Sequence, residues 1–199
     1  MRLGILGGTF DPIHLGHLLM AEMAGEALKL EKVLFVPAGD PPHKQNRTIT
    51  AARHRRRMVE LAIEGNARFE LCPIDLERPG PHYSVDTVHL IRRQYDIGAD
   101  ACFFIIGGDS LADLPIWHDP EKLVPLCRLA VAHRPGYQPD ISDLEKMIPG
   151  LGARLDWVPI PVVDFAASTI RARLRKGQSI RYQVPESVWQ YIHQHNLYQ

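Results

Sequence analysis

The chain has 199 residues, of which 45% are hydrophobic and 23% charged, and its formal net charge is zero. These values are ordinary for a globular protein with a sizeable core, so we treat residues 1–199 as a single domain. A balanced charge gives no overall field that would attract nucleic acid or an acidic membrane surface, and no apolar run is long enough to span a bilayer. We therefore expect no nucleic-acid and no membrane partner, and the sequence leaves the oligomeric state open.

The cysteines point to a reducing environment. Cys72, Cys102 and Cys127 are odd in number, widely spaced and without a CxxC pair, which argues against a disulfide framework and a zinc knuckle. The N-terminus lacks the apolar region of a signal peptide. We expect plain buried thiols at Cys102 and Cys127, and the cytoplasm as the location.

Short apolar runs alternate with helical patterns along the chain. The predicted strands are, in order, Leu3–Leu6, Val33–Val36, Phe69–Leu71, Cys102–Ile106, Leu129–Ala132 and Leu155–Val158. The predicted helices are Leu15–Leu30, Ala51–Glu64, Val85–Tyr95, Glu121–Leu126, Ser142–Ile148, Ser168–Lys176 and Glu186–His195. The run Cys102–Ile106 is apolar throughout, which is typical of a strand covered on both faces. The pattern predicts an α/β fold with a doubly wound parallel sheet, helices on both faces and a helical C-terminal tail from about residue 165.

The first predicted strand runs directly into Gly7–Leu18, with the sequence GGTFDPIHLGHL. Glycines at the carboxyl end of a strand let the backbone approach a ligand closely, and open α/β sheets bind ligands at that edge. The following helix offers free N–H groups and the positive end of its dipole, which favour phosphate. The spacing matches neither GxGxxG nor GxxxxGK(S/T), so the dinucleotide and P-loop fingerprints are absent.

Two histidines add to this phosphate-binding pattern. His14 and His17 are three residues apart, so on a helix they share one face, and an imidazole is a compact donor that can carry charge near neutral pH. A surface pair or a metal site is the simpler interpretation of such a motif, but no further ligand follows at a spacing suited to zinc. We expect Asp11 to cap the helix and both histidines to face a phosphate.

As a whole, GGTFDPIHLGHL resembles the signature of bacterial nicotinate mononucleotide adenylyltransferases, which belong to the nucleotidyltransferase superfamily with an HxGH motif. The resemblance implies a Rossmann-like fold and transfer of the AMP part of ATP to nicotinate mononucleotide, with release of pyrophosphate. It implies that His17 acts on the α-phosphate and the transition state, with His14 beside it. It also places a run of four residues in the ATP site: Gly7, Gly8, Thr9 and Phe10.

A second motif opens the predicted helix Ser168–Lys176. Ser168 is predicted to cap this helix while its hydroxyl, the free N–H groups and Arg171 face one anion; a capped amphipathic helix with solvated arginines is the alternative. The segment resembles the family motif I-S-(S/A)-T-x-I-R, with Phe165 in place of Ile, Ala166 in place of the first Ser and Ser168 in place of Thr. The resemblance implies that Ser168 and Arg171 hold the β- and γ-phosphates of ATP.

Three weaker matches lie in the middle of the chain. Gly107 and Asp109 belong to a Gly-Gly-Asp turn after the most apolar strand, where a carboxylate can reach ribose hydroxyls, although an N-cap aspartate gives the same pattern. Ser84 is a predicted N-cap whose hydroxyl or N–H could instead receive a pyridine carboxylate. Trp117 is most simply a core anchor, whereas the resemblance implies that it stacks on the nicotinate ring.

The remaining matches lie in loops. His43 and Lys44 belong to a PPHK segment that is most simply a rigid loop with a solvated lysine, while the resemblance implies contact with the mononucleotide. Arg134 precedes a Pro-Gly turn and is implied to lie near the mononucleotide phosphate. By contrast, the basic run RHRRR at 53–57 is predicted to be a solvated helix face rather than a nucleic-acid site.

Adenylyl transfer needs positioning and electrostatic stabilisation more than covalent chemistry. We therefore expect Mg²⁺ to accompany ATP, held by the substrate phosphates and water rather than by a carboxylate cage. Several alternatives stay open: transfer to nicotinamide mononucleotide or to phosphopantetheine, a cytidylyltransferase, or a non-catalytic nucleotide-binding module. A fragment of a class I aminoacyl-tRNA synthetase does not fit the length or the absence of a Lys-rich second signature.

Overall fold

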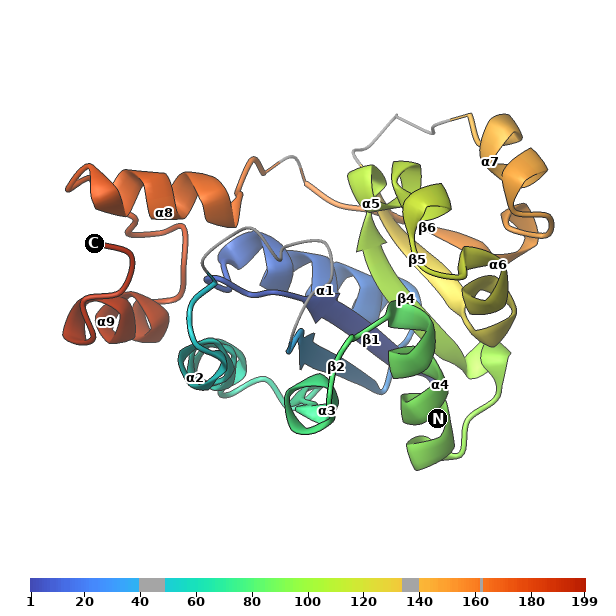
Figure 1. The fold of residues 1–199 in the computed structure, drawn as a ribbon, viewed down its shortest axis with the longest axis horizontal. Helices are drawn as coiled ribbons and strands as arrows, with labels where there is room; N and C mark the ends of the chain where they lie inside the picture. The colour runs from blue at the N-terminus through green and yellow to red at the C-terminus, as the bar shows by residue number, and fades with distance from the viewer. Residues whose placement is uncertain (40–48, 134–139, 162) are drawn as a thin grey trace.

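The structure, a computed structural model, describes residues 1–39, 49–133, 140–161 and 163–199. Within these residues, six parallel strands form one sheet in the order β3-β2-β1-β4-β5-β6 (Figure 1). The strands are β1 (Leu3–Gly8), β2 (Lys32–Pro37), β3 (Phe69–Leu71), β4 (Cys102–Gly107), β5 (Arg128–His133) and β6 (Leu155–Pro159). All six predicted strands are confirmed, and their order is that of the Rossmann fold.

The helices of the described residues connect these strands and follow the last one. They are α1 (Leu15–Ala27), α2 (Ala52–Ile63), α3 (Ile74–Glu77), α4 (Ser84–Tyr95), α5 (Gly108–Ala112), α6 (Pro120–Leu123), α7 (Ser142–Met147), α8 (Ala167–Arg175) and α9 (Glu186–Gln194). The sequence did not predict α3 and α5, because each has too few residues for a periodic pattern.

Two predicted helices end three residues earlier than expected, and the other predicted ends agree to within one residue. α1 ends at Ala27 because Lys29 takes a left-handed conformation with φ 50°, and the Leu30 N–H returns to the Gly25 carbonyl at 2.9 Å. Leu30 is nevertheless buried, so its side chain extends the apolar pattern beyond the helix. α6 ends at Leu123 and continues as a 3-10 turn around Pro125, whose nitrogen has no N–H for an α-helical bond.

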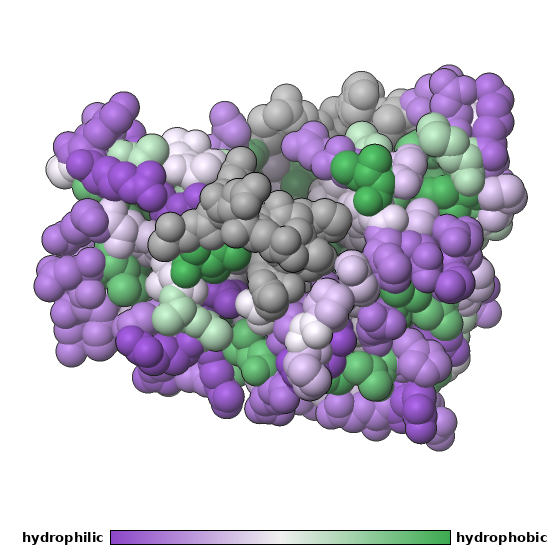
Figure 2. Space-filling model, viewed as in Figure 1, coloured by the Kyte–Doolittle hydropathy of each residue, from purple (hydrophilic) through white to green (hydrophobic). Residues whose placement is uncertain are grey.

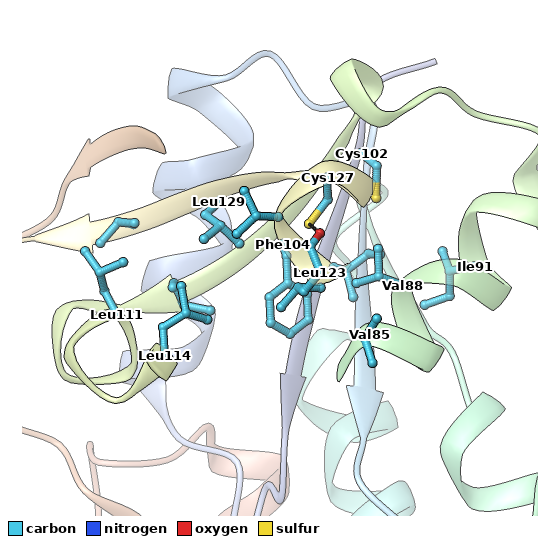
Figure 3. Close-up of a cluster of buried hydrophobic side chains, with 14 of the residues drawn as sticks. Val85, Val88, Ile91, Cys102, Phe104, Leu111, Leu114, Leu123, Cys127 and Leu129 are labelled. Carbon is cyan, nitrogen blue, oxygen red and sulfur yellow. Dashed lines mark hydrogen bonds between the residues drawn. The ribbon is translucent and has the colours of Figure 1, made fainter. Parts of the chain in front are cut away.

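The sheet has an apolar core on each face. In β4, the side chains of Phe104 and Ile106 point to one core, and those of Phe103 and Ile105 point to the other. Figure 3 shows the first core, in which α4 directs Val85, Val88 and Ile91 toward Phe104 and the thiols of Cys102 and Cys127. Both faces of β4 are therefore covered, which explains its unbroken apolar run.

The second core is covered by helices from both ends of the chain. α1, α2, α8 and α9 contribute Ala21, Met58, Ile170 and Val188, all fully buried. Figure 1 shows α8 and α9 at one end of the molecule, with α9 beside α2. The predicted helical tail is thus confirmed, and it packs on the same face of the sheet as α1.

The surface gives no sign of a membrane segment in the described part of the chain. No helix there combines the length and the apolar character needed to cross a bilayer. The face in Figure 2 is mainly hydrophilic, with apolar side chains in small separate areas.

Candidate functional site

A cleft of about 1330 Å³ opens at the carboxyl ends of β1, β4 and β5. The strand order reverses between β1 and β4, and open α/β sheets bind ligands at such a point. Among the residues that line the cleft are many of those predicted from the sequence: Gly7, Gly8, Thr9, His17, Ser84, Gly107, Asp109 and Trp117. The fold therefore brings the opening motif and the middle motifs to one place.

Phe10 packs against His17, one of the residues that line the cleft. Its backbone is left-handed, with φ 49°, and its side chain is 2% exposed. The ring meets His17 edge-on with centroids 5.0 Å apart, and it lies 5.9 Å from Phe35. A Cβ on Gly8 would sit 3.0 Å from the Phe10 ring, so the turn needs glycine there. The Phe10 side chain therefore packs in the core against His17, and Phe10 is not among the described residues that line the cleft.

His14 and His17 form a stacked pair at the start of α1. Their ring centroids are 3.6 Å apart and their planes differ by 22°. The His14 backbone N–H donates to His17 Nδ1 at 3.2 Å. Because Nδ1 accepts this bond, the proton of a neutral His17 sits on Nε2. His17 thus enters the cleft with a fixed ring orientation and a defined tautomer.

His14 is the more buried ring of the pair. It is 6% exposed, and burial lowers its pKa from the ordinary 6.5 to about 4. Its Nδ1 has no hydrogen-bond partner among the described residues. A Cβ on Gly16 would lie 3.1 Å from that nitrogen, so Gly16 makes room for the imidazole. His14 is also the N-cap of α1, so the prediction that Asp11 caps this helix is wrong.

Asp11 instead takes part in a buried polar cluster. Its carboxylate is 5% exposed and accepts a hydrogen bond from the Tyr198 hydroxyl at 2.7 Å. The Thr50 N–H points to its other oxygen at 3.4 Å. The Asp11 backbone carbonyl accepts a bond from Arg171 Nη1 at 2.7 Å. These contacts tie the loop before α1 to α8 and to the end of the chain.

Arg55 is a support of the loops around the cleft that sequence reasoning missed. It is 2% exposed, whereas the basic run at 53–57 was predicted to be a solvated face. Its guanidinium donates to the carbonyls of Thr50 (2.9 Å), Thr9 (2.8 Å), Ala38 (2.7 Å) and Gly39 (3.3 Å). The prediction is therefore wrong for Arg55, which holds together the segments that follow β1 and β2. Its spacing from Met58 and Val59, at i+3 and i+4, is the signal that places it on the buried face.

The start of α8 differs from the prediction. The N-cap is Ala166 and the helix begins at Ala167, so Ser168 is an exposed second residue rather than the cap. Arg171 points to the Asp11 carbonyl. No residue of α8 is among the described residues that line the cleft. The structure thus places Arg171 beside the histidine loop, at the margin of the site.

The other wall of the cleft is aromatic. Trp117 packs edge-on against Phe104, with centroids 6.1 Å apart, and His118 stacks on Tyr83 at 3.8 Å. Ser84 is the first residue of α4, whose N-cap is Tyr83, so the predicted capping by Ser84 is wrong. The sequence did not single out Tyr83 and His118, because stacking between separate segments leaves no local pattern.

A buried carboxylate lies below this wall. Asp75 lines the cleft although it is only 7% exposed, and the Thr87 hydroxyl lies 2.9 Å from each of its oxygens. Arg78 Nε donates to Asp75 Oδ1 at 2.9 Å. The bonds from Thr87 to Asp75 hold the start of α4 against α3, and so they also fix the position of Ser84.

Comparison with known proteins agrees with this geometry. A family model described as cytidylyltransferase-like matches residues 5–183. A protein of Thermomicrobium roseum named "probable nicotinate-nucleotide adenylyltransferase" is 50% identical over 99% of this chain and 91% of its own length. A protein of the same name from Roseiflexus sp. is 42% identical over 98% of this chain and 97% of its own length. The chain belongs to the nicotinate-nucleotide adenylyltransferase family.

Solved structures share the fold of this adenylyltransferase family member. The nicotinic acid mononucleotide adenylyltransferase of Plasmodium falciparum complexed with NaAD superposes with a TM-score of 0.78 at 22% identity, covering 98% of this chain and 96% of that one. The same protein complexed with APC gives a TM-score of 0.77 at 21% identity, covering 100% and 98%. At this identity the likeness supports the fold.

The structure also shows how this adenylyltransferase accommodates its departures from the family motif. Phe165, in the place of Ile, lies with its ring centroid 6.5 Å from that of His14. Its Cβ would be 3.5 Å from a Cβ on Gly16, so it closes the space behind the histidine pair. The predicted binding residues His43, Lys44 and Arg134 lie outside the described residues.

Proposed function

We propose that this chain transfers the adenylyl group of ATP to nicotinate mononucleotide, giving deamido-NAD and pyrophosphate, a step of NAD biosynthesis. One observation carries the proposal: a relative of that name is 50% identical over 99% of the chain. The cleft supports it, because glycines, a histidine of defined tautomer and an aromatic wall meet at the switch point of the sheet.

The chemistry asks little covalent work of the protein. The mononucleotide phosphate is already an anion and attacks the α-phosphorus of ATP without a general base, while pyrophosphate leaves with the bond electrons. Catalysis then depends on bringing two anions together and on stabilising the charge that develops. We assign His14 to orienting the phosphates beside His17, on whose ring it stacks.

We assign His17 to the α-phosphate. Its Nε2–H is the donor of a fixed ring, so little reorganisation is needed as charge builds on the non-bridging oxygens. The backbone at Gly7, Gly8 and Thr9 lines the same part of the cleft and can approach the nucleotide closely.

The β- and γ-phosphates are assigned to the margin of the site. Ser168 is exposed at the start of α8, and Arg171 lies against the Asp11 carbonyl, from which its other guanidinium N–H groups can reach an anion. Mg²⁺ is part of the substrate in this proposal, carried by the ATP phosphates and water. Asp109 is exposed on the rim of the cleft, in reach of a ribose.

The aromatic wall is assigned to the mononucleotide. Trp117 offers a ring face for the pyridine, and Ser84 opens α4 with a hydroxyl and a free N–H suited to a carboxylate. His43, Lys44 and Arg134 stay proposed contacts of the mononucleotide. We also propose that residues 1–199 work as one domain in the cytoplasm, since both cores share one sheet and the three cysteines are free, buried thiols.

The test is pyrophosphate release from Mg-ATP, with nicotinate mononucleotide and nicotinamide mononucleotide compared in parallel. We expect a large kcat/KM preference for the acid. Equal use of both would keep the reaction and remove the specificity. Release with neither, but with phosphopantetheine, would assign a different acceptor. ATP binding in calorimetry without any release would support a non-catalytic module.

A further inference from the structure

One buried polar cluster joins the histidine loop to the end of the chain. The Tyr198 hydroxyl donates to Asp11 Oδ1 at 2.7 Å, and Arg171 Nη1 donates to the Asp11 backbone carbonyl at 2.7 Å. Asp11 is thus bonded through its side chain to the C-terminal segment and through its backbone to α8. Tyr198 has no part in the substrate contacts proposed above.

The Tyr198 hydroxyl is the closer of two hydrogen-bond donors to the buried Asp11 carboxylate, which also interacts electrostatically with Arg55. Asp11 is 5% exposed, and a carboxylate removed from water needs donors at its oxygens. The second donor, the Thr50 N–H, is distant at 3.4 Å. Burial and the Asp11 carboxylate raise the pKa of the Tyr198 hydroxyl, which therefore stays protonated and keeps its role as donor at neutral pH.

We propose that Tyr198 is a positioning residue for adenylyl transfer, acting through Asp11 on the loop that carries His14 and His17 and on Arg171. The inference rests on the proposed function. Asp11 stands two residues after Thr9, which lines the cleft, so a shift of its carboxylate moves the loop. It also moves the carbonyl against which Arg171 is held.

The geometry predicts an effect on ATP alone. The residues assigned to ATP phosphates, His17 and Arg171, both depend on the Asp11 loop. The wall assigned to the mononucleotide is fixed separately, through Asp75 and Phe104. Loosening Asp11 should therefore weaken ATP binding and leave mononucleotide binding unchanged.

The experiment compares Tyr198→Phe with wild type, with both substrates varied at a temperature well below each unfolding midpoint. We expect the KM for ATP to rise by up to about 10-fold, which corresponds to a loss of about 1.4 kcal/mol of ATP binding free energy through the displaced loop. The KM for nicotinate mononucleotide should stay within about twofold, the scatter expected of independent sites. A merely structural role would lower the active fraction, and so kcat, with both KM values unchanged.

Tyr95→Phe is the matched control. Its hydroxyl also donates to a carboxylate, Glu70 Oε1 at 3.1 Å, and neither residue lines the cleft. We expect this variant to lose stability without a change in either KM. Equal KM values for ATP in the two variants would overturn the proposal.

A double-mutant cycle with Asp11→Asn tests whether Tyr198 acts through Asp11. In the Asn background the hydroxyl meets a neutral amide, so Tyr198→Phe should have a smaller effect on ATP than in wild type. Strictly additive effects would contradict the inference. If wild type releases no pyrophosphate, the proposed function fails by itself, and calorimetric ATP affinities of the same variants still test the positioning role.

Discussion

The strongest prediction concerns Arg55, and the change to make is Arg55→Met. Methionine has about the length of the arginine stem and no donors. It leaves the carbonyls of Thr50, Thr9 and Ala38 without the guanidinium that they contact at 2.7 to 2.9 Å. It also removes a cation that interacts electrostatically with the Asp11 carboxylate. Burial lowers the pKa of Arg55, and the Asp11 carboxylate opposes this shift.

The size of the effect follows from these contacts. Each buried carbonyl left without its donor typically costs about 1–3 kcal/mol in the free energy of unfolding. The three losses do not add in full, because the groups act as one network, so we expect a total of about 3–5 kcal/mol. For a chain of this length each kcal/mol lowers the midpoint by roughly 2–4 °C, so we expect a loss of about 10 °C.

The assay is circular dichroism during urea unfolding, which gives the free energy, and during heating, which gives the midpoint, with Arg56→Met as the control. Arg56 is the next residue of the same helix, but its side chain is exposed and pairs with Glu60 on the surface at 3.0 Å. Such a pair contributes about 0–1 kcal/mol. Equal losses of stability in the two variants would refute the view that Arg55 clamps the loops after β1 and β2.

Three further predictions concern the cleft. His17→Ala should lower kcat by about 10²-fold or more, since it removes a donor to the transition state; kinetics near wild type would remove His17 from the mechanism. Trp117→Ala should raise the KM for nicotinate mononucleotide and leave the KM for ATP unchanged. A change in the KM for ATP alone would show that the aromatic wall binds ATP instead. The pKa of His14 is lowered by burial from 6.5 to about 4. Between these two pH values, His14 is therefore protonated in the unfolded chain and neutral in the folded chain. Stability should fall as the pH drops from 6.5 to 4, by up to about 3 kcal/mol, and His14→Gln should flatten this part of the profile; an unchanged profile would contradict a neutral His14.

The strands were predictable because their signal is local. Each is a short apolar run, and in β4 the run is unbroken because Phe103 and Phe104 enter different cores. Helix ends were less predictable. Asp11, Ser84 and Ser168 are all residues that cap helices well, yet none of them is the N-cap in the structure.

The wrong predictions for Asp11 and Arg55 share one physical cause. The Asp11 carboxylate is used by Tyr198, which is distant in sequence, and a local pattern contains no information on that bond. Arg55 was hidden in a basic run for the same reason, since its partners are carbonyls of other segments. The motif residues of the cleft could be predicted because glycines and histidines at strand ends are local features of the sequence. Tyr198 and Arg55, which hold the neighbouring loops, could not be predicted because their partners are distant in sequence.

The strand order has a consequence for how the molecule is assembled. β1 is synthesised first and lies in the middle of the sheet, between β2 and β4. Its β2 edge is paired after a short connection, whereas the other edge waits until Cys102–Gly107 has left the ribosome. An apolar strand with an open edge can pair wrongly with another chain. The cleft lies over this seam, so the pairing that closes the open edge of β1 also brings together the first two of the strands that border the cleft.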